Sequence, residues 1–225
     1  MSYLSLSHCM NKKEEREVSK KELLQEGKFT PSLLNSLVEK EVFELYYKES
    51  NLLPYTAKTP LSPLSELQSR AKEEIVEQFK THNVVLLHGV TSSGKTEIYM
   101  HFIKEVLDSQ RNVLYLVPEI ALTTQLMQRL QSVFGEHLWV YHSKYSDGAR
   151  FRVWEKMLHS KGGELVLGVR SSIFLPLENL GLVIVDEEHE TSYKQFEPAP
   201  RYHARDAAIV LASLYGAKVL LGTAT

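Results

Sequence analysis

Eight consecutive residues, from Gly89 to Thr96, match the phosphate-loop pattern G-x-x-x-x-G-K-[ST]. Gly89 and Gly94 allow the backbone to curl so that its amide groups, including that of Thr91, face the phosphates of a nucleotide. Lys95 supplies positive charge to the β and γ phosphates, and the hydroxyl of Thr96 can bind Mg²⁺. A β-prone run precedes the loop and a helical pattern follows it. The sequence therefore predicts a binding site for ATP and Mg²⁺ rather than an ordinary strand–helix turn.

A second group of reactive side chains is the run Asp-Glu-Glu-His at residues 186–189, which follows an apolar stretch at 182–185. A carboxylate at a strand end beside a phosphate loop is in place to bind Mg²⁺, and we assign this role to Asp186. Glu187 is in place to orient or deprotonate the attacking water. An acidic run after a strand is more often the solvated start of a helix, but the phosphate loop favours catalysis. We expect Lys95, Asp186 and Glu187 to be the catalytic residues.

The elements that must position these motifs alternate along the chain after Leu64. The expected strands are residues 84–87, 113–117, 139–141, 165–167, 182–185 and 219–221. The expected helices are residues 97–107, 122–134, 148–158 and 205–214. Continuous apolar strands separated by amphipathic helices are typical of an α/β fold, a doubly wound, mostly parallel sheet covered on both faces. Ligands bind such sheets at the carboxyl ends of the strands, where both motifs fall.

The residues in front of this region predict a small winged-helix domain over residues 1–52. Residues 1–17 are polar and charged, and we expect a solvated helix or linker there. Ser19 and Glu22 have the spacing of a capping box, and Pro31 after Thr30 marks a second helix start. An alternating, β-prone run follows at residues 42–47. Helix, turn, helix, strand is the order of a winged helix, although small units of this kind are common.

A linker over residues 53–66, with Pro54, Pro60 and Pro63, separates the first domain from a larger one over residues 67–225. Residues 220–225 combine an apolar strand with a small-residue turn. A protein seldom ends at such a point, because the strand exit normally leads into more structure. We therefore expect the larger domain to be truncated at its C-terminal end.

The composition restricts the class of protein. The 225 residues include 43% hydrophobic and 24% charged residues, which is typical of a soluble globular protein. The net charge of −2 means that any contact with DNA must come from a local patch or from parts of the protein outside this sequence. Cys9 is the one cysteine, which excludes an internal disulfide and a cysteine-rich zinc site. The sequence contains no apolar run that could span a bilayer and no secretion signal, so we expect a cytoplasmic protein with no membrane partner.

Several segments resemble the PriA family, the primosomal replication-restart DNA helicases, which are superfamily 2 helicases of the DExH type. The resemblance runs from about Leu67 to the end of the chain. Its segments are residues 89–96, 117–123, 141–143, 168–174, 186–189, 201–206 and 222–225. The resemblance implies that residues 67–225 form the first of two RecA-like motor lobes, and the winged-helix pattern in front of it fits the same family.

The resemblance also implies roles for single residues. Gln68 would read the adenine base, although a lone glutamine is as often an ordinary polar helix position. The residues that would contact single-stranded DNA are Pro118, Glu119, Arg170, Ser171, Tyr193, Phe196, Tyr202 and Arg205. The last four belong to an aromatic-rich loop, and aromatic side chains among cations suit base stacking and phosphate contact. Any one of these tyrosines could instead be a core residue. His189, Thr223 and Thr225 would couple the ATP state to the grip on DNA.

By this resemblance the whole enzyme would be an ATP-dependent 3′-to-5′ DNA helicase that assembles the primosome at stalled forks. Its partners would be forked and single-stranded DNA, other primosome proteins and single-strand-binding protein. A second lobe, absent here, would carry zinc and the arginine residues that complete ATP hydrolysis, so we expect little turnover from this chain. The alternative is a nucleotide-driven DNA translocase or regulator that does not separate strands. A DNA-binding module without catalysis is disfavoured by the phosphate chemistry.

Overall fold

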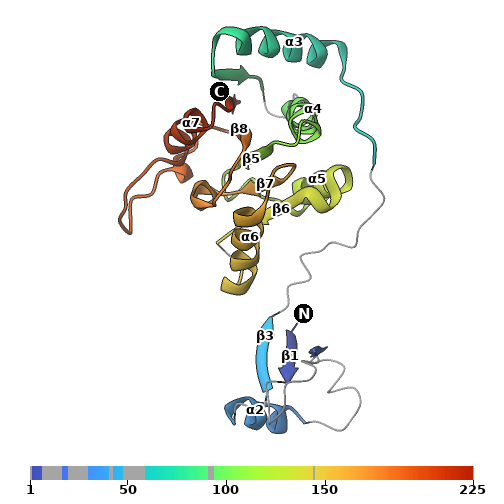
Figure 1. Ribbon diagram of the computed structural model, residues 1–225, viewed down its shortest axis with the longest axis vertical. Coiled ribbons are helices and arrows are strands. Elements are labelled where there is room, and N and C mark those ends of the chain that lie inside the picture. Colours follow the sequence, from blue (N-terminus) through green and yellow to red (C-terminus); the bar gives the residue numbers. More distant parts are fainter. Residues whose placement is uncertain are drawn as a thin grey trace. The chain divides into compact units, whose positions relative to one another are not determined.

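The computed structural model describes residues 2–6, 17–19, 30–40, 43–47, 59–90, 94–143 and 145–224. The chain divides into two units, Met1–Leu52 and Leu53–Thr225 (Figure 1). We describe each unit separately.

Within its described residues, the first unit contains a three-stranded antiparallel sheet and one helix. The elements are β1 (Ser2–Leu6), β2 (Glu17–Ser19), α2 (Pro31–Glu39) and β3 (Phe43–Tyr47), and the strand order is β2-β1-β3. The helix start predicted at Thr30 is confirmed, because the Thr30 hydroxyl accepts a hydrogen bond from the amide of Leu33. The predicted strand is confirmed as β3.

The expectation of a solvated helix or linker over residues 1–17 is wrong for Ser2–Leu6, which form a strand. This strand pairs along its whole length with β3, Ser2 opposite Tyr47 and Leu6 opposite Phe43. A partner about forty residues away supplies the hydrogen bonds, and local composition carries no sign of it. Ser19 is the last residue of β2, and Glu22, with the helix expected around it, lies outside the described residues.

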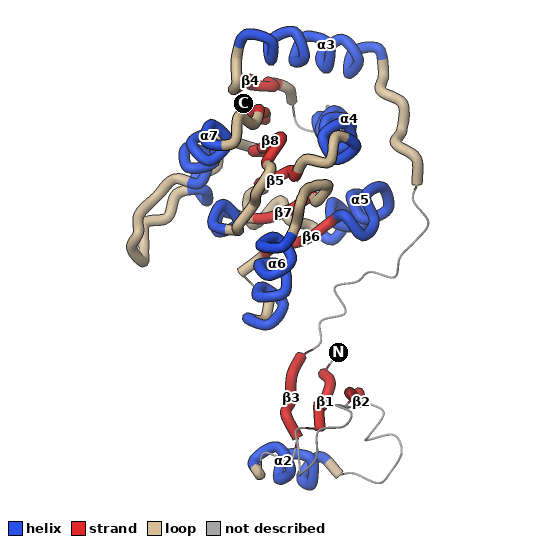
Figure 2. Tube along the Cα trace, in the orientation of Figure 1, coloured by secondary structure: helices blue, strands red, loops and turns tan. Residues whose placement is uncertain are grey.

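The second unit is built on a sheet of six parallel strands, counted over its described residues (Figure 2). The strands are β4 (Val84–His88), β5 (Asn112–Leu116), β6 (Leu138–Tyr141), β7 (Leu165–Gly168), β8 (Leu180–Val185) and β9 (Lys218–Thr223), in the order β4-β9-β8-β5-β7-β6. All six predicted strands are present, and the observed bounds differ from the predicted ones by one or two residues.

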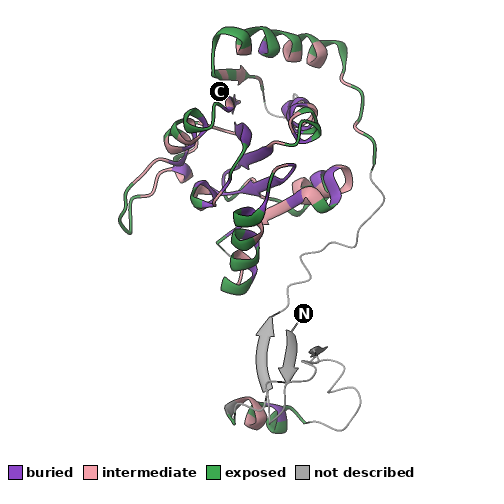
Figure 3. Ribbon diagram, in the orientation of Figure 1, coloured by how far each residue is buried: buried purple, intermediate pink, exposed green. Residues whose placement is uncertain are grey.

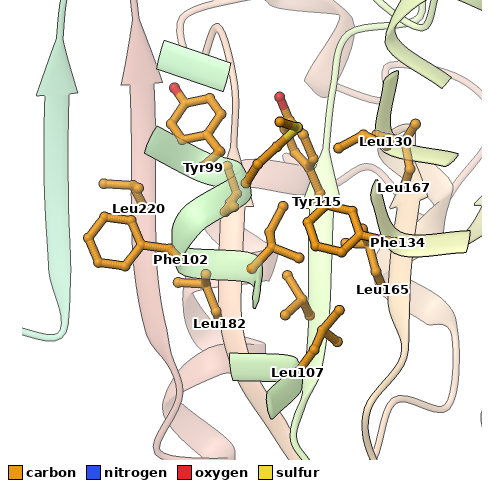
Figure 4. Packing of buried hydrophobic residues seen from close by; sticks show 14 of the residues in the cluster. Tyr99, Phe102, Leu107, Tyr115, Leu130, Phe134, Leu165, Leu167, Leu182 and Leu220 are labelled. Atoms are coloured by element: carbon orange, nitrogen blue, oxygen red, sulfur yellow. The ribbon is translucent and has the colours of Figure 1, made fainter. Parts of the chain in front are cut away.

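Helices cover both faces of this sheet, as predicted. The α-helices are α3 (Glu66–Thr81), α4 (Lys95–Asp108), α5 (Thr124–Phe134), α6 (Asp147–His159) and α7 (Ala204–Leu214). Two apolar clusters lie on opposite faces, because successive side chains of a strand point to opposite sides. Val113 and Tyr115 of β5 pack on one face with α4 and α5, whereas Leu114 and Leu116 pack on the other with α6 and α7. Figure 3 shows the central strands as buried, and Figure 4 shows the first cluster.

The predicted linker is partly wrong, because residues 59–65 pack against the second unit. Leu61 and Leu64 lie against the first apolar cluster, and the amide of Thr59 donates to the carbonyl of Ser132 at 2.7 Å. The prolines of this segment indicated a linker, but Leu61 and Leu64 bury apolar surface against the second unit. Residues 51–58 lie outside the described part of the chain. No helix in the described ranges has the length and apolar character to cross a membrane.

Candidate functional site

The residues predicted to do chemistry lie at one edge of the six-stranded sheet. Gly89 follows β4, Pro118 follows β5, Arg170 follows β7, Asp186 follows β8 and Thr223 ends β9. The strands are parallel, so their carboxyl ends meet at the same edge, and segments far apart in the sequence become neighbours.

A cleft of about 650 Å³ opens at this edge. Its lining includes six of the predicted site residues: Gln68, Gly94, Lys95, Thr96, Asp186 and Glu187. It also includes residues that were not predicted as site residues: Ser62, Pro63, Glu97, Tyr115, Ala121, Thr123, Gln125, Leu126 and Arg129. Two signals in the sequence could have pointed to some of them: Glu97 directly follows Thr96 of the phosphate loop, and Ala121 and Thr123 lie in the family-like segment 117–123. In the structure Glu97 forms an ion pair with Arg129 of α5.

The end of the phosphate loop has the geometry that the motif requires. Gly94 adopts a left-handed conformation with φ of +81°, and a Cβ atom there would lie 2.2 Å from the side-chain nitrogen of Gln68. The left-handed conformation favours glycine at this position, and the close approach shows how tightly Gln68 packs on it. Lys95 begins α4, and its buried ammonium donates to the carbonyl of Gly89 at 2.8 Å. The amides at the start of α4 suit an anionic ligand. Thr91 lies outside the described residues.

Gln68 packs directly against the phosphate loop. Its side-chain amide donates to the carbonyl of Gly94 at 3.3 Å, and its side-chain oxygen accepts from the amide of Ser65 at 2.8 Å. The hydroxyl of Ser65 in turn accepts from the amide of Gln68, which completes a capping box at the start of α3. Gln68 is thus more than an ordinary polar helix position, because it connects this cap to the loop. Its reading of adenine stays a prediction.

Asp186 sits where β8 ends and is surrounded by hydrogen-bond donors. Its Oδ1 atom accepts from the hydroxyl of Tyr99 at 3.0 Å and from the amide of Glu187 at 3.1 Å. The hydroxyl of Tyr115 lies 3.4 Å from Oδ2. Burial raises the pKa of the Asp186 carboxyl above its usual value, and the hydrogen bond from Tyr99 opposes this shift in part.

Glu187 has a positive φ of 46°, a conformation that residues other than glycine seldom adopt. Its Oε1 atom lies 3.5 Å from the ammonium nitrogen of Lys95. The tight turn after β8 therefore aims the carboxylate at the phosphate loop. This carboxylate balances the positive charge of Lys95.

The oxygen donors at the site fit Mg²⁺. Thr96 and Asp186 line the same cleft, and both present hard oxygen atoms. Among the residues that the structure describes, no group of three or more His, Cys, Asp or Glu side chains forms a metal cage. Mg²⁺ is usually held by one or two carboxylates together with substrate phosphates, so this sparse donor set suits an ion that arrives with a nucleotide.

The predicted coupling residues connect β8 to β9. The Nδ1 atom of His189 lies 3.0 Å from the hydroxyl of Thr223, and the amide of Glu188 donates to the carbonyl of Gly222 at 2.8 Å. A movement of either strand end would therefore reach the acidic motif. Thr225 lies outside the described residues.

Residues 193–205, which we call the aromatic segment, consist of a hairpin and the first two residues of α7. Lys194 and His203 form an antiparallel bridge, and the amide of Gln195 donates to the carbonyl of Tyr202 at 2.8 Å. Figure 1 shows this hairpin, in orange, extending away from the sheet next to α7. Phe196 is 67% exposed near its tip, so its ring is available for stacking.

Tyr193 corrects the set of predicted DNA-contact residues. It is 1% exposed, and its hydroxyl donates to the carbonyl of Asp186 at 2.6 Å and lies 3.2 Å from the carbonyl of Leu116. In this conformation its ring cannot stack on a base. The side chain packs in the core, which satisfies both its apolar ring and its hydroxyl.

The other predicted DNA-contact residues differ in their exposure. Arg170, half-buried in the short 3₁₀ helix η2 (Arg170–Phe174), donates to the carbonyls of Ser192 and Lys194, at 3.4 and 3.0 Å, and so holds the base of the aromatic segment. Arg205 forms an ion pair with Glu188 at 2.6 Å.

Tyr202 has its ring edge-to-face with Phe174, at 4.9 Å between centroids. Pro118 is buried, so like Tyr193 it is not available to DNA in this conformation and corrects the prediction. Ser171 is half-buried and Glu119 is exposed. Cations and aromatic rings therefore share this edge of the sheet, but Arg170 and Arg205 already have partners within the chain.

Comparison with known proteins supports this description. Residues 65–225 match the family model "DEAD/DEAH box helicase", and residues 1–50 match the model "Winged helix domain, PriA helicase, Bacteroidota". The chain is 43% identical over 210 residues to "Replication restart protein PriA" of Bacillus subtilis, covering 91% of this chain and 26% of that protein. It is 46% identical over 165 residues to the protein of the same name from Helicobacter pylori, covering 73% of this chain and 26% of that protein.

The chain spans about a quarter of the length of these relatives. Among solved structures, it resembles RecG bound to a three-way DNA junction, with a TM-score of 0.53 and 17% identity, covering 88% of this chain and 23% of that one. It also resembles the DUF1998 helicase MrfA bound to DNA and AMPPNP, with a TM-score of 0.51 and 20% identity, covering 75% of this chain and 27% of that one. At this identity the likeness shows the fold alone, an α/β lobe of the RecA-like type, as predicted.

Proposed function

The chain belongs to the DEAD/DEAH box helicase family, and from this membership we propose that it is the ATP-binding lobe of a 3′-to-5′ DNA helicase of replication restart. One observation carries the proposal. The Nζ atom of Lys95, in the phosphate loop, lies 3.5 Å from the Oε1 atom of Glu187, in the acidic motif, although the two residues are 92 positions apart in the sequence. Both residues line the cleft. Relatives named replication restart protein support the biological role.

Side chains that line the cleft would carry out the nucleotide chemistry. The ammonium of Lys95 would turn from the carbonyl of Gly89 and the carboxylate of Glu187 towards the β and γ phosphates. Glu187, released from Lys95, would then orient or deprotonate the attacking water. Thr96 and Asp186 would hold Mg²⁺, which supplies charge neutralisation on the phosphates when bound. Gln68, on the other side of Gly94, would contact the adenine base.

Single-stranded DNA would cross the carboxyl edge of the sheet. Glu119 and Phe196 are exposed there, and Ser171 and Tyr202 are half-exposed. Arg170 and Arg205 would exchange their present partners, the carbonyls of the aromatic segment and Glu188, for phosphate groups. These exchanges supply a route for coupling. Glu188 belongs to the acidic motif, and the carbonyls held by Arg170 lie on either side of Tyr193, which contacts Asp186.

The proposed coupling route follows three sets of contacts within the chain. Arg170 holds the carbonyls on either side of Tyr193, and Tyr193 holds the carbonyl of Asp186. His189 holds Thr223 at the end of β9. DNA bound at Arg170 would therefore shift the turn that aims Glu187.

The whole enzyme would act on forked and single-stranded DNA, together with other primosome proteins and single-strand-binding protein. We further propose that a second lobe supplies zinc and the arginine residues of hydrolysis. The relatives are about four times as long as the matched region, which leaves room for such a lobe. The second candidate is a translocase or regulator that moves on DNA without separating strands, and the same cleft would serve it.

Nucleotide binding is tested by calorimetry with ATP analogues and Mg²⁺. We expect the chain to bind, and Lys95→Ala to abolish binding without altering thermal unfolding. The matched control is Lys104→Ala on the same helix, because Lys104 is exposed and pairs with Asp108 away from the cleft. Equal binding by the wild type and Lys95→Ala would refute the phosphate-loop assignment.

Strand separation and polarity are tested with the full-length enzyme on duplexes that carry a 3′ or a 5′ single-stranded tail. A 3′-to-5′ helicase unwinds the substrate with the 3′ tail. Displacement of streptavidin from biotinylated single strands without unwinding of either duplex would instead support the translocase. Unwinding of the 5′-tailed duplex alone would refute the proposed polarity.

A further inference from the structure

Two tyrosine side chains reach the catalytic carboxylate from inside the core. Tyr99 of α4 and Tyr115 of β5 are both 0% exposed, and their rings meet edge-to-face at 5.7 Å. Figure 4 shows the two hydroxyl oxygens at one end of the apolar cluster, pointing away from Leu107 and Leu182. Both hydroxyl groups donate to the carboxylate of Asp186. A buried hydroxyl needs a partner, but apolar residues could have filled these positions without that need.

The two oxygens of the Asp186 carboxylate are held differently. Oδ1 accepts two hydrogen bonds, from Tyr99 at 3.0 Å and from the amide of Glu187 at 3.1 Å. Among the residues that the structure describes, Oδ2 has one contact, the longer one of 3.4 Å from Tyr115. The rotation of the carboxylate is therefore set at Oδ1, and Oδ2 keeps most of its acceptor capacity for a ligand in the cleft.

The lack of a side chain at Gly222 of β9 leaves room for the hydroxyl of Tyr99 beside Asp186. A Cβ atom at Gly222 would lie 1.9 Å from the hydroxyl oxygen of Tyr99 and 2.9 Å from Oδ1 of Asp186. The tyrosine hydroxyl thus occupies the space between the phosphate-loop helix, the acidic motif and β9. The glycine at position 222 is required by this hydroxyl, which marks the contact as a built feature of the site.

We propose that Tyr99 is a positioning residue for the metal: its hydroxyl holds Oδ1 of Asp186 so that Oδ2 faces the Mg²⁺ ion of the bound nucleotide. The inference rests on the proposed function, since it assumes that Asp186 serves a nucleotide-bound ion. Tyr99 touches neither nucleotide nor metal in this arrangement. It acts through Asp186, as partners of ligating carboxylates do in other metal sites.

The experiment measures binding of a fluorescent, non-hydrolysable ATP analogue, mant-labelled adenylyl imidodiphosphate, at increasing Mg²⁺ concentrations. The proteins are the wild type, Tyr99→Phe and the control Tyr215→Phe, whose ring is exposed after α7. Removal of a hydrogen bond to a metal-binding carboxylate typically weakens metal affinity about tenfold or more. We expect Tyr99→Phe to need about tenfold more Mg²⁺ for half-maximal binding. Its affinity in excess chelator should equal that of the wild type.

A second variant keeps the test decisive if Tyr99→Phe folds poorly. Gly222→Ala retains the tyrosine, but its methyl group meets both the hydroxyl of Tyr99 and Oδ1 of Asp186 and so disrupts their hydrogen bond. This variant should show the same increase in the Mg²⁺ requirement. An unchanged Mg²⁺ requirement in both variants would overturn the inference, and so would an equal loss of affinity with and without Mg²⁺, which indicates a structural role. Absence of analogue binding by the wild type would instead overturn the proposed function, and this inference with it.

Discussion

The hydroxyl of Tyr193 donates to the main-chain carbonyl of Asp186 at 2.6 Å. The residue at the start of the aromatic segment is therefore attached to the residue that opens the acidic motif. Arg170 grips the carbonyls of Ser192 and Lys194 on either side of this tyrosine. These hydrogen bonds connect the base of the hairpin to the turn that carries Glu187.

Phe196→Ala should weaken the coupling of DNA binding to ATP hydrolysis while leaving stability unchanged, because the ring is 67% exposed. Stacking contributes about 1–3 kcal/mol per base, so DNA-stimulated ATPase should fall about fivefold or more relative to the basal rate. The measurement is the ratio of stimulated to basal rates in the full-length enzyme at one salt concentration. Tyr215→Ala is the control. An unchanged ratio would leave Phe196 without a role and direct attention to Arg170 and Ser171.

This chain should show almost no DNA-stimulated ATP hydrolysis on its own. An arginine from a second lobe contributes about a thousandfold or more to turnover in such enzymes. The measurement is phosphate release by the purified chain with and without single-stranded DNA. Strong stimulation that disappears in Glu187→Gln would show that the chain already holds a complete catalytic set.

Glu187→Gln should bind ATP at least as tightly as the wild type. The carboxylate lies 3.5 Å from the ammonium of Lys95, and its replacement frees that charge and removes repulsion of the phosphates. We expect an affinity gain of up to about fivefold by calorimetry, on the scale of a partly exposed ion pair. The control is Glu136→Gln, an exposed acid of the short 3₁₀ helix Gly135–His137. Weaker binding by Glu187→Gln would mean that this acid supports the nucleotide rather than competing with it.

Asp186→Asn should stabilise the nucleotide-free protein near neutral pH. Burial raises the pKa of Asp186, so the folded state disfavours its charge, and the wild type loses stability as pH rises through the raised pKa. The gain from asparagine should be absent below the ordinary aspartate pKa of about 3.9 and full above the folded-state value. Thermal unfolding across this range measures it, at about 2–4 °C per kcal/mol. Asp108→Asn is the exposed control, and a loss of stability at neutral pH would contradict the argument.

The parts of the site that lie in contiguous motifs could be predicted from the sequence. The phosphate loop needs glycine, lysine and threonine at set spacings, and the acidic motif needs a carboxylate directly after an apolar strand. Local periodicity likewise identified all six strands of the larger sheet, because a strand buried on both faces must be apolar at successive positions. These features are local, so one segment of chain is enough to state them.

Contacts between distant segments were decided by the tertiary structure. Tyr99 and Asp186 are 87 residues apart, and neither residue type announces the hydrogen bond that joins them. Tyr193 belongs to an aromatic run that suggested DNA contact, yet packing against β5 and β8 buries it. Ser2–Leu6 form a strand because β3 supplies partners. In each case the free energy comes from burial and hydrogen bonding between separate segments, which residue types alone do not specify.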